Sequence, residues 1–441
     1  MLGAKAESAP LAPTNDRSTF FRQSGWLMIA NIGGGVFMWA VHFLNKFMPD
    51  GEYGIFGALL SVIMLLPALP LQMVFAQQTA RAIATNKIGE LSALIRRAWG
   101  GTFAVWLAAM VIIFFSQDWI LDRWQLANPV GLWVTMVAVL LSIWMPIFWG
   151  VLQGQQNFLW LGWSMISNGF LRLTTAAIAV ILLYNLATAR HFSAGTYAAG
   201  VMIGVVGGVA IAVGIAVWQT RGLWKTTVAR FDWRNFSRQV TPLLLAFLSF
   251  QVLFTADTIF VKSYFTGHET DFYVGAGTLS RALMWLVGPL ATVMFPRLVQ
   301  SAAKGEKQDL MGLVLAGTAL LAVVGALSLT LLGPLVVKIV YKGSFVQEVP
   351  LLLPWYGAAM VPLSLANVLL NNLMAKPSSK GALAGWILAL AIGYVGALTQ
   401  FHRSLVQVLQ VVCVFNTLLL AVCAWFSWRA RQEPVAAVMT A

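Results

Sequence analysis

The sequence predicts an all-α integral membrane protein with about twelve transmembrane helices in two six-helix lobes. Of its 441 residues, 59% are hydrophobic and only 10% are charged, whereas a soluble domain carries about 25% charged residues. Long apolar segments follow one another along the whole chain, and its two halves share residues at a fixed shift. These observations exclude the soluble, secreted, fibrous and disordered classes.

Each predicted span has the length that crosses a bilayer, about 20 mostly apolar residues. Unpaired backbone is not tolerated in lipid, so continuous segments of this kind are predicted as helices, and bacterial outer-membrane strands would be shorter and alternating. The predicted spans are residues 24–46, 54–79, 98–117, 130–154, 157–184, 196–219, 241–264, 273–297, 311–337, 349–374, 381–400 and 404–428.

The distribution of basic residues predicts the orientation. With the N-terminus in the cytoplasm, the cytoplasmic segments carry 19 of the 28 lysines and arginines, and the opposite side carries 7. Because cytoplasmic loops are enriched in Lys and Arg, both termini are expected in the cytoplasm. The expected parts are tails 1–23 and 429–441, lobes 24–219 and 241–428, and a linker 220–240.

The linker is basic and also contains aromatic residues, such as Trp224 and Trp233. Two interpretations stay open: an amphipathic helix lying on the inner leaflet, or a solvated connection. A repeat supports the division at this point. At a shift of 220 residues, 53–75 and 273–295 share 6 of 23 positions, among them Tyr53 with Tyr273 and Gly57 with Gly277.

Glycines and prolines interrupt several predicted spans. They include Gly33 to Gly35 in span 1, Pro67 in span 2 and Pro289 in span 8. Close helix packing explains such residues in general. For these three spans, bending during alternating access is the second interpretation.

Ionisable groups at membrane depth mark functional candidates, because they are costly in lipid. Asp257 in span 7 and Arg281 in span 8 both lie about 10–12 Å below the outer surface. Antiparallel neighbours at equal depth can pair, so a structural salt bridge is one interpretation. The other is that Asp257 acts in gating or ion coupling.

Arg172 lies near the middle of span 5, and Asp257 is the single buried acid that the spans predict. At least one arginine thus lacks a carboxylate partner. Either backbone carbonyls accept hydrogen bonds from Arg172, or Arg172 faces a cavity and binds an anion. Its planar guanidinium suits phosphate. His42 and Lys46 add basic groups one turn apart, although Lys46 can also snorkel to the interface. Lys262 ends a polar stripe on span 7 that must face protein or water.

The interior is therefore expected to be cationic and to bind an anionic substrate through Arg172, Arg281, His42, Lys46 and Lys262. No metal site, cofactor site or enzyme motif is present in the sequence, and a P-loop for ATP is missing. The net charge of +13 resides in short loops, so nucleic-acid binding is not expected.

Several stretches resemble a known family. They are "NIGGGVFMWAVHFLNKFMPDGEYGIFGALLSV", "PLQMVFAQQTAR", "GVLQGQQNFLWLGWSMISNGFLRL" and "DTIFVKSYFTGHETDFYVGAGTLSRALMWLVGPLATVMFPRLV". They are similar to the Wzx-like polysaccharide biosynthesis branch of the multidrug/oligosaccharidyl-lipid/polysaccharide (MOP) flippase superfamily. The resemblance implies a V-shaped MATE-like transporter with spans 1, 2, 7 and 8 lining its cavity. His42, Lys46, Asp257, Lys262 and Arg281 fall on those spans.

The resemblance implies a flippase that moves an undecaprenyl-diphosphate-linked oligosaccharide or polysaccharide precursor, such as an O-antigen unit of lipopolysaccharide, across the bacterial inner membrane. A proton or cation gradient would drive it, with Asp257 or His42 as sensor. The expected partners are this substrate, membrane lipids and polysaccharide-synthesis proteins, and the expected unit is a monomer. The alternatives are a drug exporter of the same fold, a membrane-embedded glycan polymerase or ligase, and a scaffold in a secretion complex.

Overall fold

The computed structural model describes residues 15–187, 192–303, 310–375 and 380–432. All regular secondary structure in these residues is helical, as predicted. The first half consists of α1 (Asn15–Ala40), η1 (Val41–Phe47), α2 (Glu52–Met64), α3 (Ala68–Ala84), α4 (Ile88–Arg123), α5 (Val130–Gly154), α6 (Phe158–Leu186) and α7 (Thr196–Trp224). The second consists of α8 (Trp233–Tyr264), α9 (Gly267–Ala303), α10 (Leu310–Val340), α11 (Phe345–Ala375), α12 (Lys380–Gln400) and α13 (Leu405–Gln432).

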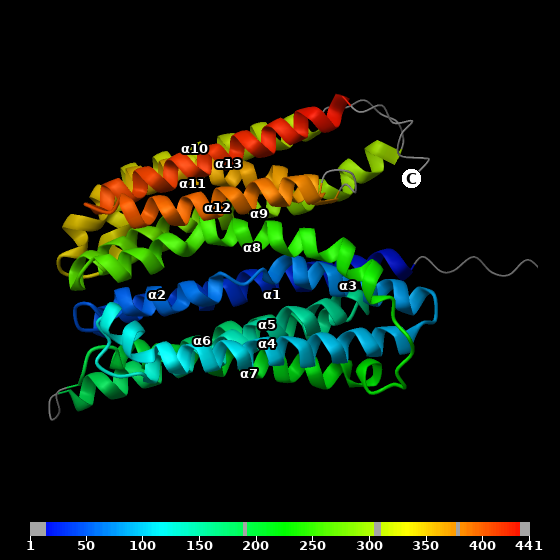
Figure 1. Ribbon diagram of the computed structural model, residues 1–441, viewed down its shortest axis with the longest axis horizontal. Coiled ribbons are helices and arrows are strands. Elements are labelled where there is room, and N and C mark those ends of the chain that lie inside the picture. The colour runs from blue at the N-terminus through cyan, green and yellow to red at the C-terminus, as the bar shows by residue number, and fades with distance from the viewer. Residues whose placement is uncertain (1–14, 188–191, 304–309, 376–379, 433–441) are drawn as a thin grey trace, which may run out of the picture.

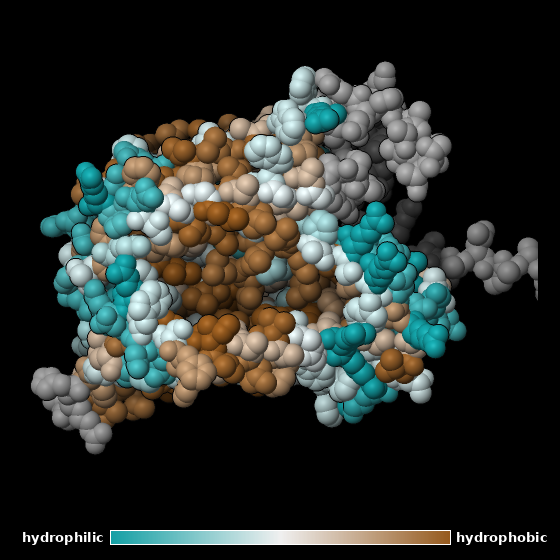
Figure 2. Space-filling view, in the orientation of Figure 1, coloured by the Kyte–Doolittle hydropathy of each residue, from teal (hydrophilic) through white to brown (hydrophobic). Residues whose placement is uncertain are grey.

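Eleven segments of the described residues are long and apolar enough to cross a membrane. The remaining predicted span, 273–297, lies in α9, part of whose side chains falls outside the described residues. Apolar side chains are exposed along the middle of these helices, for example Val105 of α4 at 72%. Figure 2 shows the result as a hydrophobic band between two polar ends, which is the surface that a bilayer requires.

The two halves form two helix bundles that lie side by side (Figure 1). In the first, α1 packs on α6, α6 on α7, α5 on α7, and both α3 and α4 on α5. In the second, α8 packs on α12, α12 on α13, α11 on α13, and both α9 and α10 on α11. These are the same five pairings six spans further along, so the repeat seen in the sequence is also a repeat of helix packing. We call the bundles the N-lobe and the C-lobe.

The lobes meet through α2, which packs against α8 and α9. Two glycines of α2 permit this approach. A Cβ atom at Gly54 would lie 2.8 Å from Cγ2 of Thr270, and one at Gly57 would collide with Val274. We call this end, which carries the connections 48–51 and 341–344, the closed end. Toward the opposite end, where α1 begins and α13 ends, α9 and α13 diverge from the N-lobe helices (Figure 1).

Spans 1 and 2 are irregular at the positions where they approach the closed end. Span 1 changes from α1 to the 3-10 helix η1 at Val41. Span 2 is divided at residues 65–67, because Pro67 lacks a backbone N–H and disfavours a helical conformation before it. In contrast, α9 is one continuous helix.

Residues 220–240 do not form a separate helix. They contain the end of α7, a non-helical connection at 225–232 and the beginning of α8. Asp232 starts α8 by accepting a hydrogen bond from the Asn235 backbone N–H at 3.1 Å, a typical N-cap. The basic and aromatic residues of this segment therefore belong to three elements that fold against the N-lobe.

Candidate functional site

Arg172 of α6 is a cation in the membrane interior that has no partner among the described residues. Gly208 of α7 lets the two helices approach, since a Cβ there would lie 2.9 Å from Cβ of Arg172. The Arg172 side chain is partly exposed, and its buried Nε makes no hydrogen bond. One turn earlier, the Oδ1 atom of Asn168 is also buried without a partner. Unsatisfied groups at this depth are costly, so they mark a place for a polar ligand.

His42 of η1 is 8% exposed and begins a series of hydrogen bonds that reaches the opposite lobe. Its Nδ1 shares a 2.8 Å hydrogen bond with the Tyr53 hydroxyl of α2. That hydroxyl also shares hydrogen bonds with Tyr341, at 3.1 Å, and Thr278, at 3.3 Å, both in the C-lobe. The four side chains form a chain of contacts across the lobe interface, which we call the Tyr53 network.

Asp257 and Arg281 form the ion pair that their equal depth predicts. Nη2 of Arg281 donates to both carboxylate oxygens of Asp257 at 2.7 and 2.8 Å, and Nε donates to the Phe254 carbonyl. The hydroxyls of Tyr273 and Tyr356 donate to the same carboxylate at 2.8 and 2.5 Å. Asp257 is only 1% exposed. The pair therefore joins α8, α9 and α11 within the C-lobe.

The two remaining predicted cations lie at the closed end. Nζ of Lys46 donates to the Ile339 carbonyl of α10 at 2.6 Å, so it joins the lobes. Lys46 itself lies in the last turn of η1, and a cation is favourable at the C-terminal end of a helix. Lys262 is 2% exposed and lies within electrostatic range of Asp271 and Glu52. The polar stripe on span 7 faces protein as expected, since Thr255 and Thr258 are also buried.

Two further carboxylates are buried, which corrects the prediction of a single buried acid. Glu52 is 5% exposed and accepts hydrogen bonds from the Gly195 and Ala198 backbone N–H groups at 2.6 and 2.8 Å. Asp271 accepts from Gly51 and Gly54 at 2.6 and 2.5 Å. Each carboxylate binds the N-terminus of another helix, where the helix dipole favours an anion. Glu52 holds α7 within its own lobe, whereas Asp271 of the C-lobe holds α2 of the N-lobe.

Metal binding has no evident site in the described residues, which contain no group of three His, Cys, Asp or Glu side chains able to hold an ion. Between the lobes, Figure 2 shows a recess in the hydrophobic band, with a few polar atoms among apolar ones. A recess of this kind between two lobes is where a carrier binds its ligand.

The family of polysaccharide biosynthesis proteins matches residues 20–302. The chain belongs to this family. Among curated proteins, none matches the sequence. The fold is also that of solved structures of the MOP superfamily.

Solved structures of that superfamily resemble this chain over most of its length. An inward-facing multidrug resistance MATE family transporter gives a TM-score of 0.65 at 12% identity and covers 90% of this chain and 94% of its own. The lipid II flippase MurJ, in an inward closed conformation, gives 0.62 at 11% identity, with 94% and 88% covered. A MOP superfamily transporter from Pyrococcus furiosus gives 0.53 at 14% identity, with 94% and 95% covered. At these identities the likeness shows the fold alone.

The predicted site included His42 and Lys46 of the lobe interface but missed five other residues there. Tyr53, Tyr341, Thr278, Glu52 and Asp271 lie at or beside this interface. One signal was available, because Tyr53 and Tyr273 match in the internal repeat. Their hydroxyls have different partners, however, since Tyr53 bonds across the interface and Tyr273 bonds to Asp257.

Proposed function

We propose that this polysaccharide biosynthesis protein is an alternating-access flippase for an oligosaccharide linked to undecaprenyl diphosphate, acting in the bacterial inner membrane. Membership in the family and the MOP fold support transport. The observation that carries the substrate class is Arg172, a mid-membrane cation with no partner among the described residues. A guanidinium binds phosphate through two parallel hydrogen bonds, which makes a diphosphate a suitable ligand.

In this mechanism the diphosphate enters between the lobes and binds Arg172, while the lipid chains stay in the bilayer. One turn away on the same helix, the unpartnered Oδ1 of Asn168 is an acceptor, so it suits a hydroxyl group of the ligand and not its phosphates. The lobes then separate at the closed end and approach at the other, and the glycan is exposed outside. An exporter of organic cations would instead place a positive substrate beside this positive charge, which is unfavourable.

The test measures transbilayer movement in proteoliposomes. The probe is a fluorescent undecaprenyl-diphosphate oligosaccharide, with and without a pH gradient. Arg172→Ala is expected to lower the initial rate of transbilayer movement at least tenfold. Arg172→Lys is expected to lower it less, because lysine keeps the positive charge but cannot donate two parallel hydrogen bonds to a phosphate. Arg123→Gln, at the surface of the closed end, is the control. Wild-type rates in Arg172→Ala would refute the anion site, and movement of an organic cation instead would indicate drug export.

A further inference from the structure

The connection between the lobes forms a built groove on the N-lobe, far from the lobe interface. The Ala229 backbone N–H donates to the Gly89 carbonyl at 3.0 Å, and the Ser92 hydroxyl donates to the carbonyls of Trp224 and Thr226. Gly89 permits this approach, since a Cβ there would lie 2.9 Å from Cβ of Ala229. The connection is thus fixed against the first turns of α4.

The groove encloses about 630 Å³, and its charged lining residues are three arginines, Arg96, Arg97 and Arg230. In the part of the chain that the structure describes, none of the three forms an ion pair. Arg96 is anchored by hydrogen bonds to the carbonyls of Trp224, at 2.6 Å, and Thr226, at 3.2 Å. The guanidinium of Arg97 lies 4.8 Å from the centroid of the Trp233 ring. The groove therefore holds three positive charges, of which that of Arg96 is fixed by hydrogen bonds, and none of them belongs to an ion pair.

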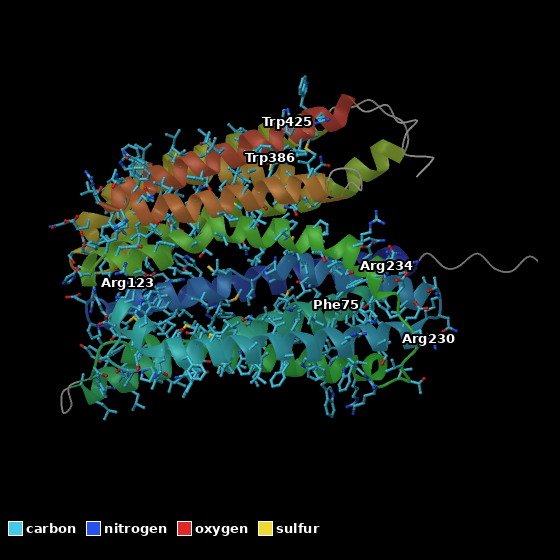
Figure 3. All side chains as sticks on the ribbon, viewed as in Figure 1. Phe75, Arg123, Arg230, Arg234, Trp386 and Trp425 are labelled. Carbon is cyan, nitrogen blue, oxygen red and sulfur yellow. The ribbon has the colours of Figure 1, made fainter. Side chains whose placement is uncertain are left out.

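Its location indicates the kind of ligand. α4 packs mainly on helices of its own lobe, and Phe103 and Leu107, on the same side of α4 as Arg96, are exposed. Trp99, Trp224 and Trp233 cluster at the same level, as tryptophans do at a membrane interface. Figure 3 places Arg230 and Arg234 at the polar end opposite to Arg123. The arginines therefore lie where phospholipid headgroups meet the protein.

We infer that this groove binds the headgroup phosphate of an anionic phospholipid, with the acyl chains along α4. Arg97 and Arg230 are the ligands that remain free to move toward the phosphate, and Arg96 supplies a fixed charge. The exposed Val228 and the Phe231 ring in the lining suit the glycerol and upper chain region. The bound lipid would hold the connection 225–232 against the N-lobe while the C-lobe moves.

The test is native mass spectrometry of the purified full-length protein, titrated with phosphatidylglycerol or with zwitterionic phosphatidylcholine. Wild type is expected to retain phosphatidylglycerol preferentially. Arg97→Gln/Arg230→Gln is expected to weaken that retention at least threefold, and Arg97→Lys/Arg230→Lys to preserve most of it. Arg123→Gln is the matched control, because Arg123 also lies over a ring, 4.5 Å from that of Tyr264, at the other end.

Three outcomes would overturn the inference. Unchanged retention in the double glutamine variant would show that the lipid binds elsewhere. Equal losses in that variant and in Arg123→Gln would show a general charge effect. Displacement of the lipid by millimolar inorganic phosphate would assign the groove to a free anion. The lysine variant keeps the test valid if the glutamine variant does not fold.

Discussion

Two arginines lie at membrane depth in this protein, and their surroundings give them different roles. Arg281 is paired with Asp257 and stacked near Phe254 and Tyr356, so its charge is already neutralised. Arg172 has no such partner in the described residues. A buried charge that keeps its counter-ion supports structure, whereas one without a counter-ion is available to a ligand.

The structural role of the pair predicts a loss of stability when one partner is neutralised. Asp257→Asn leaves a buried arginine without its carboxylate and is expected to destabilise the C-lobe by about 3 kcal/mol. Asp257→Asn/Arg281→Met removes both charges and is expected to regain most of that loss. Thermal unfolding in detergent measures both variants. If Asp257→Asn unfolds like wild type and only its transport changes, Asp257 acts in gating or ion coupling instead.

For single residues, the sequence predicts ion pairs within a lobe better than it predicts hydrogen bonds between the lobes. Equal depth on neighbouring spans was enough to predict the pair of Asp257 and Arg281. Depth gave no means to predict that Lys46 would reach the Ile339 carbonyl of α10, because that contact depends on how the lobes are tilted. Glu52 and Asp271 lie two residues before the predicted spans 54–79 and 273–297, so depth in a span did not mark them as buried acids.

Among the helices, α2 has the most informative surroundings. Its N-terminus is held by Asp271 of the other lobe, its first residue holds α7, and its glycines contact α9. It is therefore the element that must lose partners when the closed end separates. The break at 65–67 lets α2 move without carrying all of α3 with it.

Asp271→Asn is expected to favour separation of the lobes at the closed end. The variant exchanges hydrogen bonds to a charged acceptor, each worth about 1.5–3 kcal/mol, for weaker ones. We expect the ratio of separated to closed molecules to rise roughly tenfold. The readout is the distance between spin labels at Gln125→Cys and Lys342→Cys, after replacement of Cys413 and Cys423.

Glu52→Gln is the matched control for this prediction. Glu52 also binds a helix N-terminus through two backbone N–H groups, but α7 belongs to its own lobe. It should leave the label distance unchanged while lowering the stability of the N-lobe. Equal changes in both variants would mean that Asp271 does not act as a contact between the lobes.

The apolar core of each described span was predictable from its length, but several helices extend beyond the predicted bounds: α4 covers Ile88–Arg123 where 98–117 was predicted, and α8 begins at Trp233 and not at residue 241. The division of span 2 at Pro67 agrees with the expected irregularity. The segment 220–240 was harder, since its alternation of basic and aromatic residues suits a surface helix. The structure instead uses several of those side chains to line a groove on the N-lobe.

Over the whole molecule, the repeated pairings make each lobe a unit that can move as one body. The contacts between the lobes involve mainly α2, whereas the pairings within each lobe involve all its spans. Alternating access then amounts to a change in the angle between two rigid bundles.

Two pairs of spin labels test this rigid-body motion. The pair Gln125–Lys342 spans the closed end, and the pair Thr85–Gly381 spans the opposite end. Lipid-linked glycan is expected to lengthen the first distance and shorten the second. The pair Thr85–Gln125 lies at the two ends of α4 and should stay constant. Simultaneous lengthening of both interlobe distances would argue against alternating access.

The sequence predicted two lobes at this scale, from the repeat and the span count, but not which end is closed. Both ends of the lobe interface contain polar and small residues. Which end brings its residues into contact depends on the angle between the two bundles. Nor did residue type distinguish Tyr53, which bonds across the interface, from Tyr273, which bonds within its lobe.

The seam between Gly54, Gly57 and α9 also bears on leakage. Because the helices touch there with no room even for a methyl group, a continuous file of water has no space to form at that level of the seam. Protons and sodium ions need such a file to cross at a useful rate. A molecule that closes in this way can handle a bulky amphiphile without dissipating the membrane potential, and the bilayer that contains it should remain electrically silent in a conductance recording.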